Sequence, residues 1–454
     1  MVGVMAFLLS VLLTCRIPGL PLFYTIFVIP STNCPEMKYR QLSRHPVIQN
    51  AFGLYFVQIM NLVLPFILVP YLARVLTPEG WGAVVFAQSF SLWLQLIIDF
   101  GFHFSASRDV ARHRYDTQRI ENVVAGVLGA KIVLIVPAIV ATGIAMCVTP
   151  IFMQYPSYAP LALIVAILQS FFPLWYFQGQ EKMRKPVAIN VFTRVVASVF
   201  TILLVSTASD GWIVLAVQAF GAAIALVIAI WWMYREVVFV LPNVSNTQDA
   251  FLMGKSMFLF SATSSLYNSA NGFILGLFVP ANQVGFYGGA ERIHRLGISP
   301  FAPLSQALYP HMVRAVETNK NRARHLARRV LVLMLVMGLT LSSIIFLAAP
   351  RLVSLFLGAG YEESVMLLRV FAIQIPLTAM SRVLGFQWLL PHGYDSIFNK
   401  IVIAAAITNL LLAFMLVPLF GPFGMVTAFV TSELLVTVAM SIVAQRRDRL
   451  LWGK

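Results

Sequence analysis

The chain has 454 residues, of which 59% are hydrophobic and only 11% are charged, and its formal net charge at pH 7 is +15. This composition excludes an ordinary water-soluble protein, and many of the apolar runs reach the roughly 20 residues that a helix needs to cross a bilayer. The positive charge lies mostly in short links, without the interleaved aromatic residues of a nucleic-acid-binding surface, so we expect no nucleic-acid partner.

The first 36 residues are apolar but are interrupted by Arg16 and by several prolines. They lack the basic start and the cleavage site of a signal peptide. Met37, followed closely by Lys38 and Arg40, has the character of a cytoplasmic start. We interpret residues 1–36 as an N-terminal extension produced by a false start, the alternative being a real additional or peripheral segment.

From residue 47 onward, long apolar segments alternate with short links. The predicted helices, each bounded to within a few residues, are 47–73, 81–106, 121–147, 157–179, 186–207, 211–234, 252–278, 284–309, 327–349, 362–390, 398–418 and 421–445. Links this short leave no room for a soluble domain. The pattern predicts an all-α membrane protein with about twelve transmembrane helices.

The links themselves alternate between basic and nearly charge-free. The basic links hold most of the 32 Lys and Arg residues, whereas the intervening links contain only Arg74 and Arg351. Short cytoplasmic loops keep Lys and Arg, and translocated loops lose them. We therefore predict an even number of crossings, with both ends of the main body in the cytoplasm.

Two links resemble each other. Residues 72–82 and 275–285 each end an apolar helix, continue through a proline and reach a glycine that opens the next helix. Similar links at equivalent places indicate two parallel repeats related by an axis along the membrane normal. We expect two six-helix lobes, residues 37–240 and 241–454, around a central cavity.

Charged residues remain inside the predicted helices, where each costs roughly 2.5–3.5 kcal/mol near a helix centre. The basic ones are Lys131, Arg194, Arg292, Arg295, Arg369 and Arg382, and the acidic ones are Asp99, Glu291 and Glu433. Such a load indicates a water-filled interior. Because bases outnumber acids, and because Arg suits bidentate contact with phosphate or carboxylate, the cavity is predicted to be cationic and its cargo anionic.

The densest group of charges is the run from Glu291 to Arg295. Arg292 and Arg295 are three residues apart, on neighbouring parts of one helical face, and we predict that they bind phosphate. Arg194, Arg369 and Lys131 are further predicted substrate-binding residues. The alternative is an internal network of ion pairs that holds the helices together.

The three intramembrane acids are candidates for ion coupling or for charge pairing. Asp99 lies near the end of its predicted helix, just before a basic link, which favours a structural carboxylate, whereas Glu433 has apolar sequence on both sides. No catalytic motif is present, and the three cysteines have no metal or disulfide spacing, so we expect neither an enzyme nor a metal or other cofactor. Carboxamides such as Asn271 and Gln374 are candidates for sugar contacts, although bonds between helices are the default interpretation.

Five stretches, in order along the chain, resemble bacterial polysaccharide transporters of the Wzx flippase type, within the multidrug/oligosaccharidyl-lipid/polysaccharide exporter superfamily. They are Leu54–Gln58, Val69–Gly80, Asp99–Phe102, Trp175–Met183 and Gly358–Ser364. The resemblance implies twelve helices in two six-helix lobes that enclose a V-shaped central cavity.

The resemblance also implies a function. The expected cargo is an oligosaccharide repeat unit on undecaprenyl pyrophosphate, moved by ion-coupled alternating access to the periplasmic leaflet of the bacterial inner membrane for O-antigen or exopolysaccharide assembly. Membrane lipids and the polysaccharide polymerase machinery are the expected partners. The main alternative is an ion-coupled small-molecule exporter of the same superfamily, although an exporter of cationic drugs would be expected to line its cavity with acids.

Overall fold

In the computed structural model, the described residues are 46–269 and 271–448, and within them every regular element is a helix. The predicted N-terminal extension, residues 1–36, and Met37 lie outside these residues. The chain divides into two units, Met1–Gly53 and Leu54–Lys454, and the fold described below is that of the second unit.

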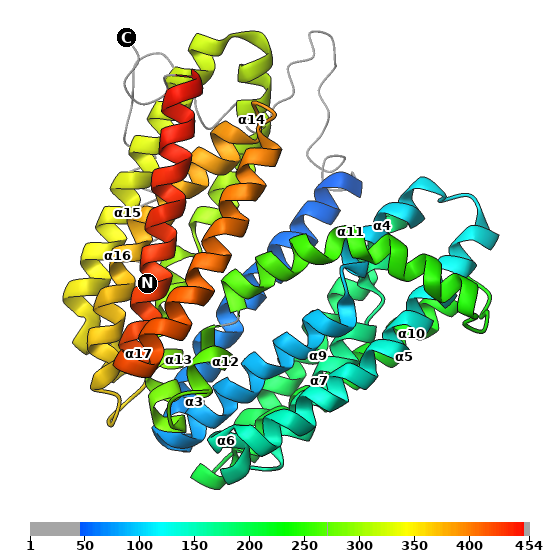
Figure 1. Cartoon of the computed structure of the whole chain (residues 1–454), viewed down its shortest axis with the longest axis horizontal. Helices are drawn as coiled ribbons and strands as arrows, with labels where there is room; N and C mark the ends of the chain where they lie inside the picture. The colour runs from blue at the N-terminus through cyan, green and yellow to red at the C-terminus, as the bar shows by residue number, and fades with distance from the viewer. Residues whose placement is uncertain (1–45, 270, 449–454) are drawn as a thin grey trace, which may run out of the picture. The chain divides into compact units, whose positions relative to one another are not determined.

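The first half of the chain forms α3 (Pro46–Asp99), α4 (Phe102–Arg112), α5 (Thr117–Val148), α6 (Pro150–Gln154), α7 (Tyr158–Phe171), α8 (Leu174–Gly179), α9 (Arg184–Leu204), η1 (Ala208–Asp210) and α10 (Gly211–Tyr234). The second half forms α11 (Val244–Ser269), α12 (Asn271–Gly276), α13 (Ala281–Ile298), α14 (Phe301–Thr318), α15 (Lys320–Phe356), α16 (Glu363–Arg382), the π-helix η2 (Val383–Leu389) and α17 (Asp395–Asp448). Figure 1 shows their arrangement.

Within the described residues, 8 helical segments are long and apolar enough to cross a membrane. Two of them bend at one non-helical residue: Thr77 in α3 has φ 61° and ψ 171°, and Gly421 in α17 has φ 55° and ψ −133°. Thr77 falls in a predicted break between two helices, and Gly421 is the first residue after another predicted break. The prediction of an all-α, multi-pass membrane protein is confirmed, while the number twelve stays a prediction.

Large apolar side chains cover much of the outside of these helices, as a lipid solvent requires. Phe192, Phe220 and Leu347 expose 63%, 70% and 77% of their surface, respectively. In water such exposure would be an aggregation hazard, but hydrocarbon chains solvate it.

Some predicted helices are shorter than expected. The helix predicted to run to residue 106 ends at Asp99, because Phe100 and Gly101 have φ of 39° and 79°. The Phe100 ring stacks on Phe258 of α11 at 4.6 Å between centroids, and a Cβ on Gly101 would lie 2.8 Å from the Met257 backbone. The turn therefore lets the chain pack closely on α11, a contact that local sequence does not reveal.

Many of the helices form two groups, and within each group the helices pack side by side. One contains α5, α7, α9 and α10, and the other contains α14, α15, α16 and α17 (Figure 1). Helix α11 begins just after the predicted lobe boundary at residue 241, yet it packs on α4 and α5 as well as on α17. A Cβ on Gly126 of α5 would lie 2.3 Å from the Asn246 carbonyl oxygen of α11. The division into 37–240 and 241–454 stays a prediction.

The two similar links meet in a symmetrical contact between α3 and α13. A Cβ on Gly82 would lie 1.7 Å from the carbonyl oxygen of Ala281, and a Cβ on Gly285 would lie 2.1 Å from that of Pro78. Gly82 comes four residues after Pro78, and Gly285 comes four residues after Ala281, so the two contacts are equivalent. Because glycine lacks a Cβ, the two backbones can approach this closely.

A second set of contacts joins α3 to the last turn of α15 and to the segment between α15 and α16. Tyr361 Oη donates a hydrogen bond to the Ala73 carbonyl oxygen at 3.0 Å, and Arg74 Nη2 donates one to the Leu355 carbonyl oxygen at 2.5 Å. Gly358, with φ 91°, leaves room for the Arg74 side chain. These contacts give a structural role to the stretch Gly358–Ser364, which carries part of the family resemblance.

Candidate functional site

A cavity of about 340 Å³ lies among α3, α7, α9, α10 and α13. We call it the larger cavity, and its volume lies within the range of small-molecule sites. Its polar lining side chains are Gln88, Ser91, Gln169, Asn190, Thr193, Arg194, Ser198, Thr201, Gln218 and Arg292. The charged side chains in this lining are basic, so the larger cavity suits an anion.

Arg292 of α13 contributes a guanidinium group that is held by uncharged partners. Its Nη2 donates a hydrogen bond to Gln88 Oε1 at 2.7 Å, and its guanidinium carbon lies 5.0 Å from the centre of the Trp81 ring. Gln88 Nε2 in turn donates to Gln218 Oε1 at 3.4 Å. A guanidinium has five N–H donors, so this arrangement orients Arg292 while leaving donors for a ligand.

Arg295 is placed differently from Arg292. Its Nη2 lies 2.9 Å from Glu291 Oε1, one turn earlier on the same helix, and its side chain is 52% exposed. Neither Arg295 nor Glu291 belongs to the lining of the larger cavity. The structure thus separates the two arginines that the sequence pattern groups as one phosphate site.

A second cavity of about 180 Å³, the smaller cavity, adjoins the larger one. The two share Gln169, Asn190, Arg194, Ala222 and Ala225. The other lining residues of the smaller cavity are Gln95, Asp99, His103, Lys131, Leu168, Ser170, Phe172, Leu174 and Trp175. Arg194, from α9, therefore lies at the junction of the two cavities.

The charges in the smaller cavity largely compensate each other. Lys131 Nζ lies 3.0 Å from Asp99 Oδ1 and also donates to the Ser170 carbonyl oxygen, and its side chain is only 4% exposed. A buried ammonium group is tolerated when it is paired and hydrogen-bonded in this way. Burial lowers the pKa of His103 from its usual 6.5, the Asp99 charge opposes this shift and the Lys131 charge reinforces it. The imidazole is therefore neutral at pH 7.

Two further predicted site residues lie in the second half of the chain, outside the lining of both cavities. Arg369 of α16 lies over the Phe346 ring, 5.5 Å from its centre. Glu433 of α17 is 5% exposed and accepts a hydrogen bond from Ser381 Oγ at 2.5 Å. Among the predicted residues, the structure brings Arg292, Arg194, Lys131 and Asp99 to the two cavities.

The carboxamides of the cavity lining did not emerge from the sequence pattern. Gln88 and Gln95 of α3 are seven residues apart, which places both on one helical face. This spacing is the feature of the sequence that indicates a shared polar face. Asn271, which the sequence offered for sugar contact, instead accepts a hydrogen bond from Asn409 Nδ2 at 3.0 Å. That pair joins α12 to α17, as the default interpretation predicted.

The sequence pattern of a family described as "Polysaccharide biosynthesis protein" matches residues 47–316. A curated relative from Escherichia coli (strain K12), described as "Putative O-antigen transporter", is 29% identical over 411 residues, which cover 89% of this chain and 97% of the relative.

Two solved structures share the fold. One, titled "Lipid II flippase MurJ, inward closed conformation", has a TM-score of 0.65 at 11% identity and covers 88% of this chain and 87% of its own. The other, an inward-facing multidrug resistance MATE family transporter of the MOP superfamily, has a TM-score of 0.60 at 17% identity and covers 86% and 98%. At these identities the likeness concerns the fold alone.

Proposed function

Because the chain belongs to the polysaccharide biosynthesis protein family, we propose that it is a flippase that moves a lipid-linked oligosaccharide across the bacterial inner membrane. The curated relative is named as a transporter rather than as an enzyme, in agreement with the prediction that the chain is not an enzyme. The observation that carries the proposal is Arg292, whose guanidinium lines the larger cavity between helices and is held by the uncharged Gln88 and Trp81.

The proposed cargo follows from the charge of this cavity. A diphosphate offers several anionic oxygens, and a guanidinium binds such groups through paired, charge-assisted hydrogen bonds. Arg292 and Arg194 both line the larger cavity and would bind the diphosphate of undecaprenyl pyrophosphate. The polyprenyl chain is apolar and remains in the bilayer while the headgroup crosses through the cavity.

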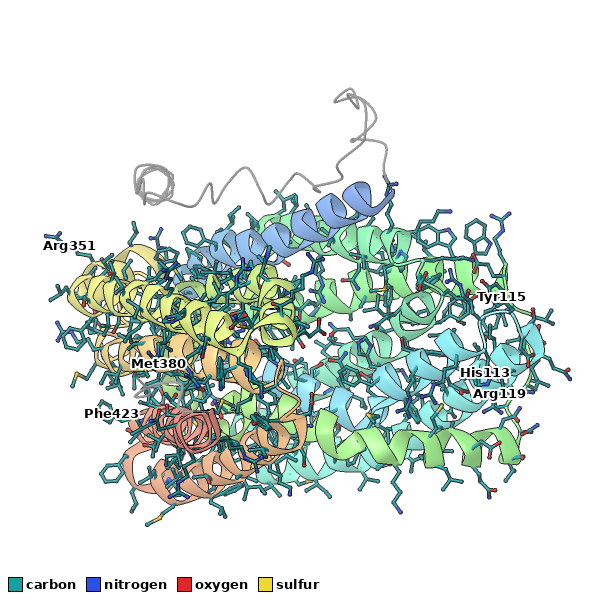
Figure 2. The ribbon with its side chains drawn as sticks, turned by 90° about the horizontal axis from the view of Figure 1, so that it is seen from above. His113, Tyr115, Arg119, Arg351, Met380 and Phe423 are labelled. Atoms are coloured by element: carbon teal, nitrogen blue, oxygen red, sulfur yellow. The ribbon has the colours of Figure 1, made fainter. Side chains whose placement is uncertain are left out.

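The proposed orientation places the basic links in the cytoplasm. In Figure 2, His113 and Tyr115 of the link between α4 and α5, together with Arg119 in the first turn of α5, lie at one end of the second unit, and Arg351 of α15 lies at the other. The orientation is supported by the charges along the sequence, because most Lys and Arg lie in alternate links and the links between them contain only Arg74 and Arg351, and Lys and Arg are retained on the cytoplasmic side.

The proposed energy source is an ion gradient or the gradient of the substrate itself, since the sequence holds no nucleotide-hydrolysing motif. Asp99 is paired with Lys131, which supports charge pairing for this acid. Glu433 remains the candidate for ion coupling. Transfer of the exported unit to a polysaccharide polymerase is part of the same proposal.

The leaflet location of lipid-linked oligosaccharide in cells that lack this protein tests the proposal. We expect the lipid to accumulate on the cytoplasmic face, and we expect the wild-type chain, but not Arg292→Ala, to restore export. Arg235→Ala is a matched control, because Arg235 also lies over a tryptophan, Trp231, at 4.7 Å, but outside both cavities. An unchanged lipid pool in the deleted strain would overturn the flippase proposal.

A further inference from the structure

The smaller cavity is lined by polar side chains that are not needed to bind a diphosphate. Gln95 of α3, Gln169 of α7 and Asn190 of α9 converge on it from three helices. Each is half-buried, and none of the three side chains makes a hydrogen bond within the described part of the chain. Three carboxamides that face one small cavity without partners are groups available to a ligand.

The chemistry of these groups favours an uncharged ligand that is rich in hydroxyls. A carboxamide presents both donors and acceptors without a net charge, and a sugar hydroxyl needs both. The cation beside them, Lys131, is already engaged by Asp99 at 3.0 Å, and His103 is neutral. An acidic sugar would therefore find a single cationic side chain here, Arg194 at the junction of the two cavities.

We infer that Gln95, Gln169 and Asn190 form a sugar-recognition site in the smaller cavity, which takes a neutral sugar of the headgroup while Arg292 anchors the diphosphate. This inference rests on the proposed flippase function and adds to it the place where sugars are discriminated. Gln169 and Asn190 line both cavities, which places the two cavities next to each other and within reach of one headgroup. A site built to hydrogen-bond hydroxyls rejects sugars that lack them, because its polar groups then stay unpaired.

Binding measurements on the purified full chain in detergent test the inference with two probes. One probe is undecaprenyl diphosphate alone, and the other is the lipid-linked oligosaccharide extracted from cells that lack this protein. The wild type should bind the glycosylated lipid more tightly. The triple variant Gln95→Ala/Gln169→Ala/Asn190→Ala should lose about tenfold or more in affinity for the glycosylated lipid, since it removes hydrogen bonds to the sugar from three side chains. Its affinity for undecaprenyl diphosphate should fall less, because Gln169 and Asn190 also line the larger cavity, and Gln95→Ala alone should leave that affinity unchanged, because Gln95 lines the smaller cavity alone.

Two further variants make the result specific. Arg292→Ala should weaken the binding of both lipids, and Gln178→Ala, which removes an exposed carboxamide outside both cavities, should weaken neither. The three pocket carboxamides have no partners to leave unpaired, so we expect the variants to keep the thermal stability of the wild type. The single variants repeat the test if the triple variant does not fold.

Three outcomes would overturn the inference. A triple variant that keeps the wild-type preference for the glycosylated lipid would show that the carboxamides do not bind sugar. Equal loss for both lipids would show that they act on the diphosphate or on the fold. If the wild type bound the two lipids with equal affinity, the sugar would contribute nothing to binding. Failure of the proposed function is distinguishable, because the deleted strain would then accumulate no lipid-linked oligosaccharide.

Discussion

Arg292 and Arg295 lie within one turn of α13, but Arg292 contacts uncharged side chains and Arg295 contacts a carboxylate. Successive helical residues are rotated by about 100°, so two residues three positions apart differ by about 60° in direction. That rotation directs Arg292 toward Gln88 and Trp81, and Arg295 toward Glu291. A small difference in direction thus decides which of two similar residues faces the cavity.

We predict that Arg292→Lys reduces transport by about tenfold while the protein still reaches the membrane. The substitution keeps the charge but removes the planar group that lies over Trp81 and donates to Gln88, and an ammonium cannot replace a stacked, forked guanidinium. Surface polysaccharide in the complemented deletion strain measures the effect. A fully active Arg292→Lys would show that charge alone suffices at this position.

Lys131 and Asp99 give a second prediction at this scale. Because Lys131 is buried and paired, Lys131→Met should lower the free energy of unfolding by on the order of 3 kcal/mol by leaving Asp99 without its partner. Adding Asp99→Asn should recover much of this loss. Thermal unfolding of the purified variants measures both effects. A double variant as unstable as the single one would contradict the pairing.

At the scale of elements, the contact between α3 and α13 depends on the absence of two side chains. The atoms that a Cβ on Gly82 or Gly285 would meet belong to the backbone of the opposite helix. A change of rotamer therefore cannot relieve the clash, and the helices themselves would have to separate.

Gly82→Ala and Gly285→Ala should each lower the free energy of unfolding by roughly 1–3 kcal/mol or more, because the added methyl group overpacks the contact. A lower melting temperature would report this loss. Gly143→Ala in α5 is the matched control, because a Cβ there meets nothing within 4 Å. The control should be neutral or slightly stabilising, since alanine favours a helix more than glycine does. Equal melting temperatures for Gly82→Ala and Gly143→Ala would count against the close crossing.

The sequence predicts the helical elements better than it predicts their contacts. The bend at Thr77 falls in a predicted link, and the bend at Gly421 falls at the first residue of a predicted helix. Pro78 and Pro422 follow these residues directly and mark the two bends in the sequence. The family resemblance is also confirmed by the match over residues 47–316. The pairing of Lys131 with Asp99 was not predictable, because it depends on how α5 and α3 are rotated toward each other.

At the scale of the whole second unit, the first and second halves of the chain meet where α3 contacts α13 and where Tyr361 contacts Ala73. We propose that both contacts lie on the external side, since the links that carry them are nearly free of Lys and Arg. A transporter that alternates its access must break such contacts when it opens outward.

Tyr361→Phe tests this role, because it removes only the hydroxyl that donates to the Ala73 carbonyl oxygen. A hydrogen bond worth roughly 0.5–1.5 kcal/mol should shift the equilibrium toward the outward-open state by about two- to tenfold. Spin labels at Met153→Cys and Arg351→Cys, on exposed positions of α6 and α15, would report the change in distance. If the spin-labelled Tyr361→Phe variant gave the same distance distributions as the spin-labelled protein that keeps Tyr361, a gating role for this hydrogen bond would be excluded.

The central claim is that Arg292 binds the anionic headgroup as the lipid crosses the membrane. The most direct measurement is the rate at which lipid-linked oligosaccharide changes leaflet in proteoliposomes that contain the purified wild type, Arg292→Ala or Arg235→Ala. We expect rapid movement with the wild type and with Arg235→Ala, and movement near that of protein-free vesicles with Arg292→Ala. Wild-type rates for Arg292→Ala would contradict the claim.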